Sequence, residues 1–170
     1  MELSSKKVIM IIAPENFRDE EYFHTREALE KKGVDVDVAS TQKVAVSGID
    51  KEEVTVDVLL DSVEDHYDAL VFVGGGGAKV YFDNQKALSL ARTYHEKGKI
   101  VAAICIAPLI LGHAGLLQDK KATCWDGVHD DLSGFGARFT GKKVTIDGTI
   151  ITGNGPKAAH KFGKTIAKAL

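Results

Sequence analysis

Short apolar runs alternate with amphipathic segments along most of the chain. Buried strands are predicted for three apolar runs, 7–12, 69–77 (ending in glycines) and 99–104, and a further strand for 34–40, which alternates. Helices are predicted where apolar positions recur at helical spacing: 19–32, 84–97, 108–115 and 157–170. Apolar strands that alternate with helices are typical of a parallel sheet covered on both faces. The pattern therefore predicts an α/β fold, a three-layer flavodoxin-like sandwich with a mostly parallel sheet and helices on both faces.

Four further segments complete the pattern. Residues 43–60 alternate and predict edge strands or a hairpin, and residues 13–18, which contain Pro14 and Asn16, predict a loop. A strand is predicted at 121–125, and a hairpin at 143–152 with its turn at Asp147 and Gly148. Because no repeat, low-complexity tract or linker interrupts the pattern, we expect one domain over residues 1–170.

Length and charge narrow the class of protein. The chain has 170 residues, 44% of them hydrophobic, and a net charge of −2. So small a charge argues against nucleic acid as a partner. No apolar run has the roughly 18 residues of a membrane span, and the first residues, MELSSKK, lack a signal peptide's apolar stretch. Because the chain has only two cysteines, we expect a reducing, cytoplasmic compartment. Because it has no apolar run long enough to span a bilayer, we expect no membrane partner.

Cys105 stands at the corner between a predicted strand and a predicted helix, in the stretch VAAICIAP. One interpretation is a small, inert core residue, since free cysteine is among the most buried residue types. The other is a nucleophile at a bend, where backbone amides and a helix N-terminus would lower the pKa of the thiol. One acid of the stretch RDEE (residues 18–21) would then meet Cys105, and the others would serve the helix dipole.

The remaining motifs favour neither a cofactor nor a metal. The run Gly74 to Gly77 matches no nucleotide-binding motif, because Lys79 stands where G-x-G-x-x-G needs its third glycine. The six histidines are scattered without zinc-ligand spacing, and His113 lies two turns beyond Cys105, too far along its helix to serve it as a base. We therefore expect no cofactor.

Four stretches in this order resemble the ThiJ/PfpI superfamily, also called the DJ-one/PfpI superfamily, which has a class I glutamine amidotransferase-like fold. They are ENFRDEE, ALVFVGGGG, AAICIAP and VTIDGTIITGNGP. The resemblance implies that Cys105 is the reactive cysteine and Glu21 the carboxyl beside its sulfur. It also implies that the amides of Gly74, Gly75 and Ile106 form an oxyanion pocket, and that the protein is a homodimer or a higher homo-oligomer.

The chain departs from the protease-like branch of that superfamily. Ile106 replaces the histidine that follows the cysteine, and Lys79 replaces a glutamate that a neighbouring subunit supplies. An intracellular peptidase is therefore disfavoured. Trp125 stands where relatives often place histidine or tyrosine at the pocket, and Asn154 where many have arginine, so we expect a more apolar pocket that binds anions less well. Cys124 is expected to be a buried strand residue.

Three functions follow from this comparison. The first is a stress-response enzyme of glyoxalase-like type, in which Cys105 attacks a small reactive carbonyl and Glu21 shuttles the proton. The second is a non-enzymatic redox sensor or chaperone-like protein, in which Cys105 is oxidised and Glu21 stabilises the product. The third is a scaffold without chemistry. Whether the protein is an enzyme thus stays open at this point.

Overall fold

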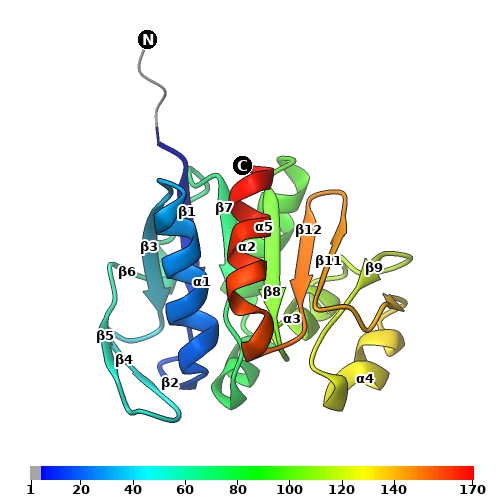
Figure 1. The fold of residues 1–170 in the computed structure, drawn as a ribbon, viewed down its shortest axis with the longest axis horizontal. Coiled ribbons are helices and arrows are strands. Elements are labelled where there is room, and N and C mark those ends of the chain that lie inside the picture. The colour runs from blue at the N-terminus through cyan, green and yellow to red at the C-terminus, as the bar shows by residue number, and fades with distance from the viewer. Residues whose placement is uncertain (1–4) are drawn as a thin grey trace.

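The computed structural model describes residues 5–170 and has a central sheet between two layers of helices (Figure 1). The sheet has seven strands in the order β11-β12-β8-β7-β1-β3-β6. They are β1 Lys7–Ile11, β3 Asp35–Ser40, β6 Val58–Leu59, β7 Ala69–Phe72, β8 Ile100–Ile104, β11 Val144–Asp147 and β12 Ile150–Gly153. All neighbours pair in parallel except β11 and β12, which form an antiparallel hairpin. The predicted flavodoxin-like α/β fold is confirmed.

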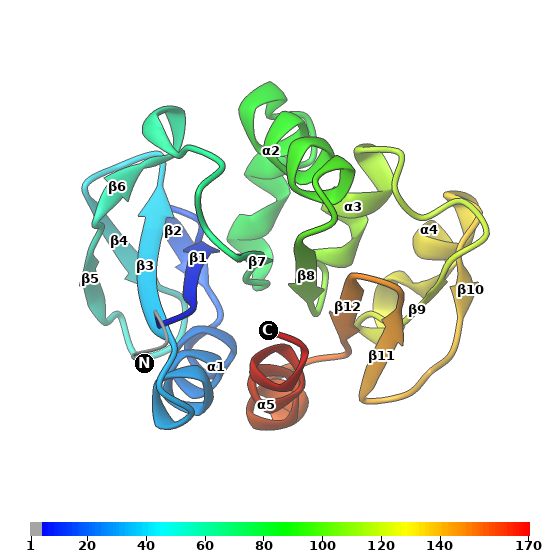
Figure 2. The same ribbon diagram turned by 90° about the horizontal axis from the view of Figure 1, so that it is seen from above.

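Helices cover both faces of this sheet (Figure 2). On one face α1 Asp19–Lys31 packs beside α5 Ala159–Ala169, and on the other α2 Gln85–Glu96 packs beside α3 Pro108–His113. Every residue of β7 and β8 is buried as a consequence, which explains why these strands show no polar alternation. No helix within residues 5–170 has the length and apolar character to cross a membrane.

A small second sheet lies beside the main one, in the order β2-β4-β5. It consists of β2 Glu15–Phe17, β4 Val44–Ser47 and β5 Glu53–Thr55. The antiparallel pair β4 and β5 confirms the hairpin expected within 43–60. Strand β2 lies in the segment predicted as a loop. It has only three residues, two of them exposed, and its pairing with β4 is irregular, so no periodic pattern reveals it.

The segment after α3 differs most from the prediction. Strand β9 covers only Lys121–Ala122, not 121–125, because the amide of Thr123 donates to the Thr152 hydroxyl instead of a strand carbonyl (2.9 Å). Helix α4 His129–Gly134 and strand β10 Arg138–Phe139, which pairs with β9, were not predicted. Both are short, and in α4 only Leu132 is buried, so neither leaves a hydrophobic period in the sequence.

The parallel strands β1, β7 and β8 end at one edge of the sheet, the lower edge in Figure 1. The segment that leads through β2 into α1, the glycine run and Cys105 follow these three strands directly. The topology therefore brings together the three features that the sequence placed at strand ends.

Candidate active site

Cys105 forms a strained corner between β8 and α3. Its φ is +66°, in the left-handed region that residues other than glycine rarely adopt. Its amide donates to the carbonyl of Gly153 (3.0 Å), and its carbonyl accepts from the amide of Trp125 (2.8 Å). These two bonds hold the strained residue from both sides, and the side chain stays partly exposed. Strain of this kind concentrates at functional sites.

Glu21 projects from the first turn of α1 toward Cys105 and is fully buried. A methyl group built on Gly74 would lie 2.4 Å from Oε1 of Glu21 and 2.6 Å from Cβ of Cys105, so both side chains pack against this glycine. Within the described residues neither carboxylate oxygen has a hydrogen bond of good geometry. The thiol of Cys105 and the amide of Gly74 are nevertheless close enough to act on the pKa of Glu21.

Burial dominates the pKa values of the pair. It raises the pKa of Glu21 to about 7, an effect that the Cys105 thiol and the charge of Arg18 partly offset. Burial, followed by the negative charge of Glu21, raises the pKa of Cys105 to about 12, against the amides of Gly75 and Ile106. The expected lowering of the thiol pKa is therefore wrong, because burial, the largest cause, acts in the opposite direction. Helix α3 has only six residues, and its effect does not outweigh burial.

Two acids that interact this strongly titrate as a pair. The pair loses one proton near pH 7 and holds the other to about pH 12. Over that range it carries one negative charge and one proton. Between these values the negative charge lies on Glu21 and the proton on the Cys105 sulfur, beside the amides of Gly75 and Ile106. This arrangement holds a nucleophile and a base that can take its proton side by side.

The glycine run gives the chain ahead of α1 room to pass over the turn. Gly75 has φ +96°, and a methyl group on it would lie 2.4 Å from the backbone nitrogen of Arg18. That nitrogen donates to the carbonyl of Gly74 (3.0 Å). The turn after β7 thus fixes the start of α1, and with it the position of Glu21.

The three acids that open α1 have three different roles. Asp19 is buried and accepts from the Ser47 hydroxyl (2.6 Å) and from the amides of Ile49 (2.9 Å) and Asp50 (3.2 Å), which anchors the loop after β4. Glu20 pairs with Nε of Arg18 (2.6 Å), and only Glu21 turns toward the thiol. The sequence analysis expected most of these acids to stabilise the helix dipole. That role does not include the tertiary contacts that the structure shows for them.

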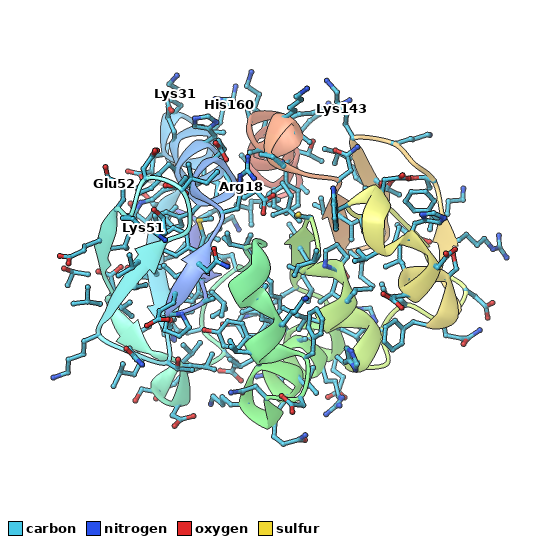
Figure 3. The ribbon with its side chains drawn as sticks, turned by 90° about the horizontal axis from the view of Figure 1, so that it is seen from below. Arg18, Lys31, Lys51, Glu52, Lys143 and His160 are labelled. Carbon is cyan, nitrogen blue, oxygen red and sulfur yellow. The ribbon has the colours of Figure 1, made fainter. Side chains whose placement is uncertain are left out.

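Arg18 is the residue that the sequence analysis missed. Figure 3 looks onto the edge where the parallel strands end and labels Arg18 there. Its positive charge is near enough to interact with Glu21 and Cys105. The feature of the sequence that could have identified Arg18 was its position three residues before Glu21, which is about one helical turn.

The other residues that the sequence analysis weighed lie around this centre or away from it. The Trp125 side chain is 51% exposed beside the elbow, while Asn154 is half-buried and Lys79 exposed. The Cys124 thiol is buried, and it donates to the Trp125 carbonyl. His113 stacks on Phe82. Residues 5–170 contain no group of three or more His, Cys, Asp or Glu side chains that could hold a metal ion.

Comparison with known proteins identifies a family and several similar proteins. Residues 6–169 match the model of the DJ-1/PfpI family. Deglycase PfpI of Pyrococcus furiosus is 32% identical over 163 residues, which cover 95% of this chain and 98% of the relative. The uncharacterised protein MJ0967 of Methanocaldococcus jannaschii is 38% identical over 172 residues, covering 99% of this chain and 84% of the relative.

A solved structure has the same fold. The crystal structure of a ThiJ/PfpI domain protein from Brachyspira murdochii superimposes with a TM-score of 0.93 at 27% identity, covering 97% of this chain and 96% of that one. The resemblance drawn from the four sequence stretches is therefore confirmed along nearly the whole chain. The chain belongs to the DJ-1/PfpI family.

Proposed function

We propose that the protein is a deglycase-type stress-response enzyme that acts on 2-oxoaldehydes and their adducts through Cys105 and Glu21, in a reducing, cytoplasmic compartment. The observation that carries the proposal is the buried Glu21 carboxyl packed with Cys105 against Gly74, its pKa raised to about 7. Relatives named deglycases support the substrate class.

In the proposed reaction Cys105 is the nucleophile and Glu21 transfers protons. The Glu21 carboxylate takes the thiol proton as the Cys105 sulfur adds to the aldehyde carbon, and it passes this proton to the carbonyl oxygen, giving a hemithioacetal. The Glu21 carboxylate then removes the hydrogen on the former aldehyde carbon and returns it to the neighbouring carbonyl carbon. The hydroxyl proton of the hemithioacetal moves to the oxygen of that neighbouring carbon, leaving a thioester of a 2-hydroxy acid. Water hydrolyses the thioester, which releases the hydroxy acid and restores the thiol.

The pocket residues support this sequence of steps. The amides of Gly75 and Ile106 act on the sulfur, and they are placed to stabilise negative charge that develops beside it. A pKa near 7 lets Glu21 give and take a proton at neutral pH. Trp125, half-exposed beside the elbow, supplies an apolar wall for the substrate.

Methylglyoxal consumption and lactate formation test the proposal. Wild-type protein should convert methylglyoxal to lactate, whereas Cys105→Ala and Glu21→Gln should lose at least a hundredfold in kcat/KM. Cys124→Ala is the matched cysteine control and should keep wild-type activity. Equal rates in wild type and Cys105→Ala would exclude the enzyme.

A redox sensor is the second candidate, favoured by the buried Glu21 carboxyl, whose two oxygens have no hydrogen-bond partner among the described residues. A protonated Glu21 could donate to a sulfinate formed on Cys105 by peroxide. Mass spectrometry after mild peroxide treatment tests this alternative. Oxidation should occur first at Cys105, and oxidation at Cys124 at the same rate would contradict the sensor.

We also propose a homodimer or higher homo-oligomer. Three apolar side chains other than Trp125 are about half exposed in the single chain: Ile49 (53%), Val80 (48%) and Ile146 (54%). Burying them in a subunit interface would remove apolar area from water. Light scattering should give a multiple of the 18.3 kDa chain mass, and a mass of one chain would contradict the proposal.

A further inference from the structure

Arg18 brings a positive charge to the site without filling its hydrogen-bonding capacity. Within the described residues its guanidinium makes one hydrogen bond, from Nε to Glu20, and the two Nη groups donate to no protein atom. The side chain is 39% exposed. A guanidinium offers five donors in a planar fork that suits carboxylate and phosphate oxygens. Four of these donors are therefore available to a ligand.

The backbone fixes where this side chain begins. The Arg18 amide donates to the carbonyl of Gly74, in the same turn that packs against Glu21 and Cys105 (3.0 Å). Its carbonyl accepts from the amide of Tyr22 in the first turn of α1 (3.2 Å). The start of the Arg18 side chain is thus fixed by backbone bonds to the glycine turn and to α1, and its charge acts on Glu21 and Cys105.

The charges around the site indicate how the positive charge of Arg18 would act on a ligand. Asn154 is neutral, Glu20 already pairs with Nε, and the two Nη groups donate to no carboxylate that the structure describes. A thiolate on Cys105 would repel an anionic ligand. The positive charge of Arg18 would offset this repulsion and attract an anionic ligand toward the sulfur.

We propose that Arg18 is the specificity-determining residue of this site and selects substrates that carry an anionic group, a carboxylate or a phosphate, beside the reactive carbonyl. The inference rests on the proposed function for its reaction. It replaces the sequence expectation that the Asn154 substitution makes the pocket poor at binding anions. The anion-binding group comes from the start of α1.

Alkylation of Cys105 tests the selectivity without requiring turnover. Iodoacetate and iodoacetamide are similar in size and differ in charge, and with both the thiolate forms an S–C bond as iodide leaves. The ratio of their rate constants cancels any change in the thiolate fraction. We expect this iodoacetate-to-iodoacetamide ratio to fall at least tenfold in Arg18→Gln. Arg18→Lys should retain most of it, because the charge remains.

Matched variants make the outcome decisive. Arg138→Gln removes an exposed arginine from β10 and should leave the ratio unchanged. Glu20→Gln frees Arg18 of its partner and should raise the ratio, so the proposal can be tested even where Arg18→Gln does not fold. An equal ratio in wild type and Arg18→Gln, or no rise in Glu20→Gln, would overturn it.

Substrate and competitor assays then separate the two anions. Wild type should prefer 4,5-dioxopentanoate to its neutral methyl ester by at least tenfold in kcat/KM, a preference that Arg18→Gln loses. Stronger protection of Cys105 from iodoacetamide by inorganic phosphate than by acetate would assign the phosphate class, and the reverse a carboxylate. If neither aldehyde is turned over but the alkylation ratio still depends on Arg18, the proposed reaction fails and anion recognition stands.

Discussion

The α-carbon of Gly74 faces the carboxyl of Glu21 so closely that a methyl group on it would lie 2.4 Å from Oε1. The same methyl group would lie 2.6 Å from the carbonyl oxygen of Ile104, which the sheet prevents from moving. Gly74→Ala should therefore displace Glu21 from Cys105. We expect a loss of about 1–3 kcal/mol in the free energy of unfolding.

Gly134→Ala is the control for that substitution. Gly134 ends α4, and a methyl group on it would meet no atom within 4 Å. Its free energy of unfolding, from urea titration, should stay within about 0.5 kcal/mol of wild type. Equal effects of the two substitutions would show that the close approach at Gly74 carries no cost.

The stability of the protein should depend on pH through Glu21. Burial raises the pKa of this carboxyl from 4.5 to about 7 on folding. The folded state therefore binds more protons than the unfolded state between those values, and stability falls as the pH rises from about 4.5 to about 7. The loss is on the order of 3 kcal/mol. Urea unfolding from pH 4.5 to 8 measures it.

Glu21→Gln should flatten that dependence, because an amide does not titrate. Its free energy of unfolding should change less than that of wild type between pH 4.5 and 8. Parallel curves for the two proteins would mean that Glu21 does not titrate in this range.

The pH profile of Cys105 alkylation should show two steps in wild type. Reactivity should first rise near pH 7, as the pair loses one proton, and again toward pH 12 as it loses the second. In Glu21→Gln only the thiol titrates, so a single step is expected. Two unchanged steps in Glu21→Gln would show that Glu21 is not the partner. Iodoacetamide labelling of Cys124→Ala protein measures Cys105 alone.

Asp19 should stabilise the loop after β4. Burial acts to raise the pKa of Asp19, but the bonds from Ser47, Ile49 and Asp50 outweigh it and lower the pKa. The carboxylate therefore contributes stability above its unfolded pKa of 3.8, and that contribution is lost as the pH falls through the lower folded value. At pH 7, Asp19→Ala should cost about 2–4 kcal/mol, since three donors lose their partner.

Urea unfolding at pH 3 and pH 7 checks this cost. The difference between wild type and Asp19→Ala should shrink at pH 3. The exposed Asp61→Ala is the control and should change stability by less than about 0.5 kcal/mol at either pH. A similar loss in both variants would refute the role of the buried bonds.

The hydrophobic periods of the chain are enough to predict the sheet, its covering helices and the corner at Cys105. These features depend on local periods: β7 and β8 are apolar throughout because helices cover both faces, and α1 and α2 carry apolar positions at helical spacing. The order of strands and helices then fixed which strand ends share an edge. Cys105 was predictable as a candidate because it stands directly at such an end.

The roles of the three acids in the first turn of α1, and the direction in which the pKa values move, depend on the packed structure. Asp19, Glu20 and Glu21 are consecutive and chemically alike, yet one anchors a loop, one pairs with Arg18 and one is buried against Gly74. The local sequence does not distinguish these three acids, because their roles depend on contacts with other residues: the loop after β4, Arg18 and the glycine turn after β7. Burial is a property of the packed chain, so the raised pKa values of Glu21 and Cys105 could not be derived from sequence spacing.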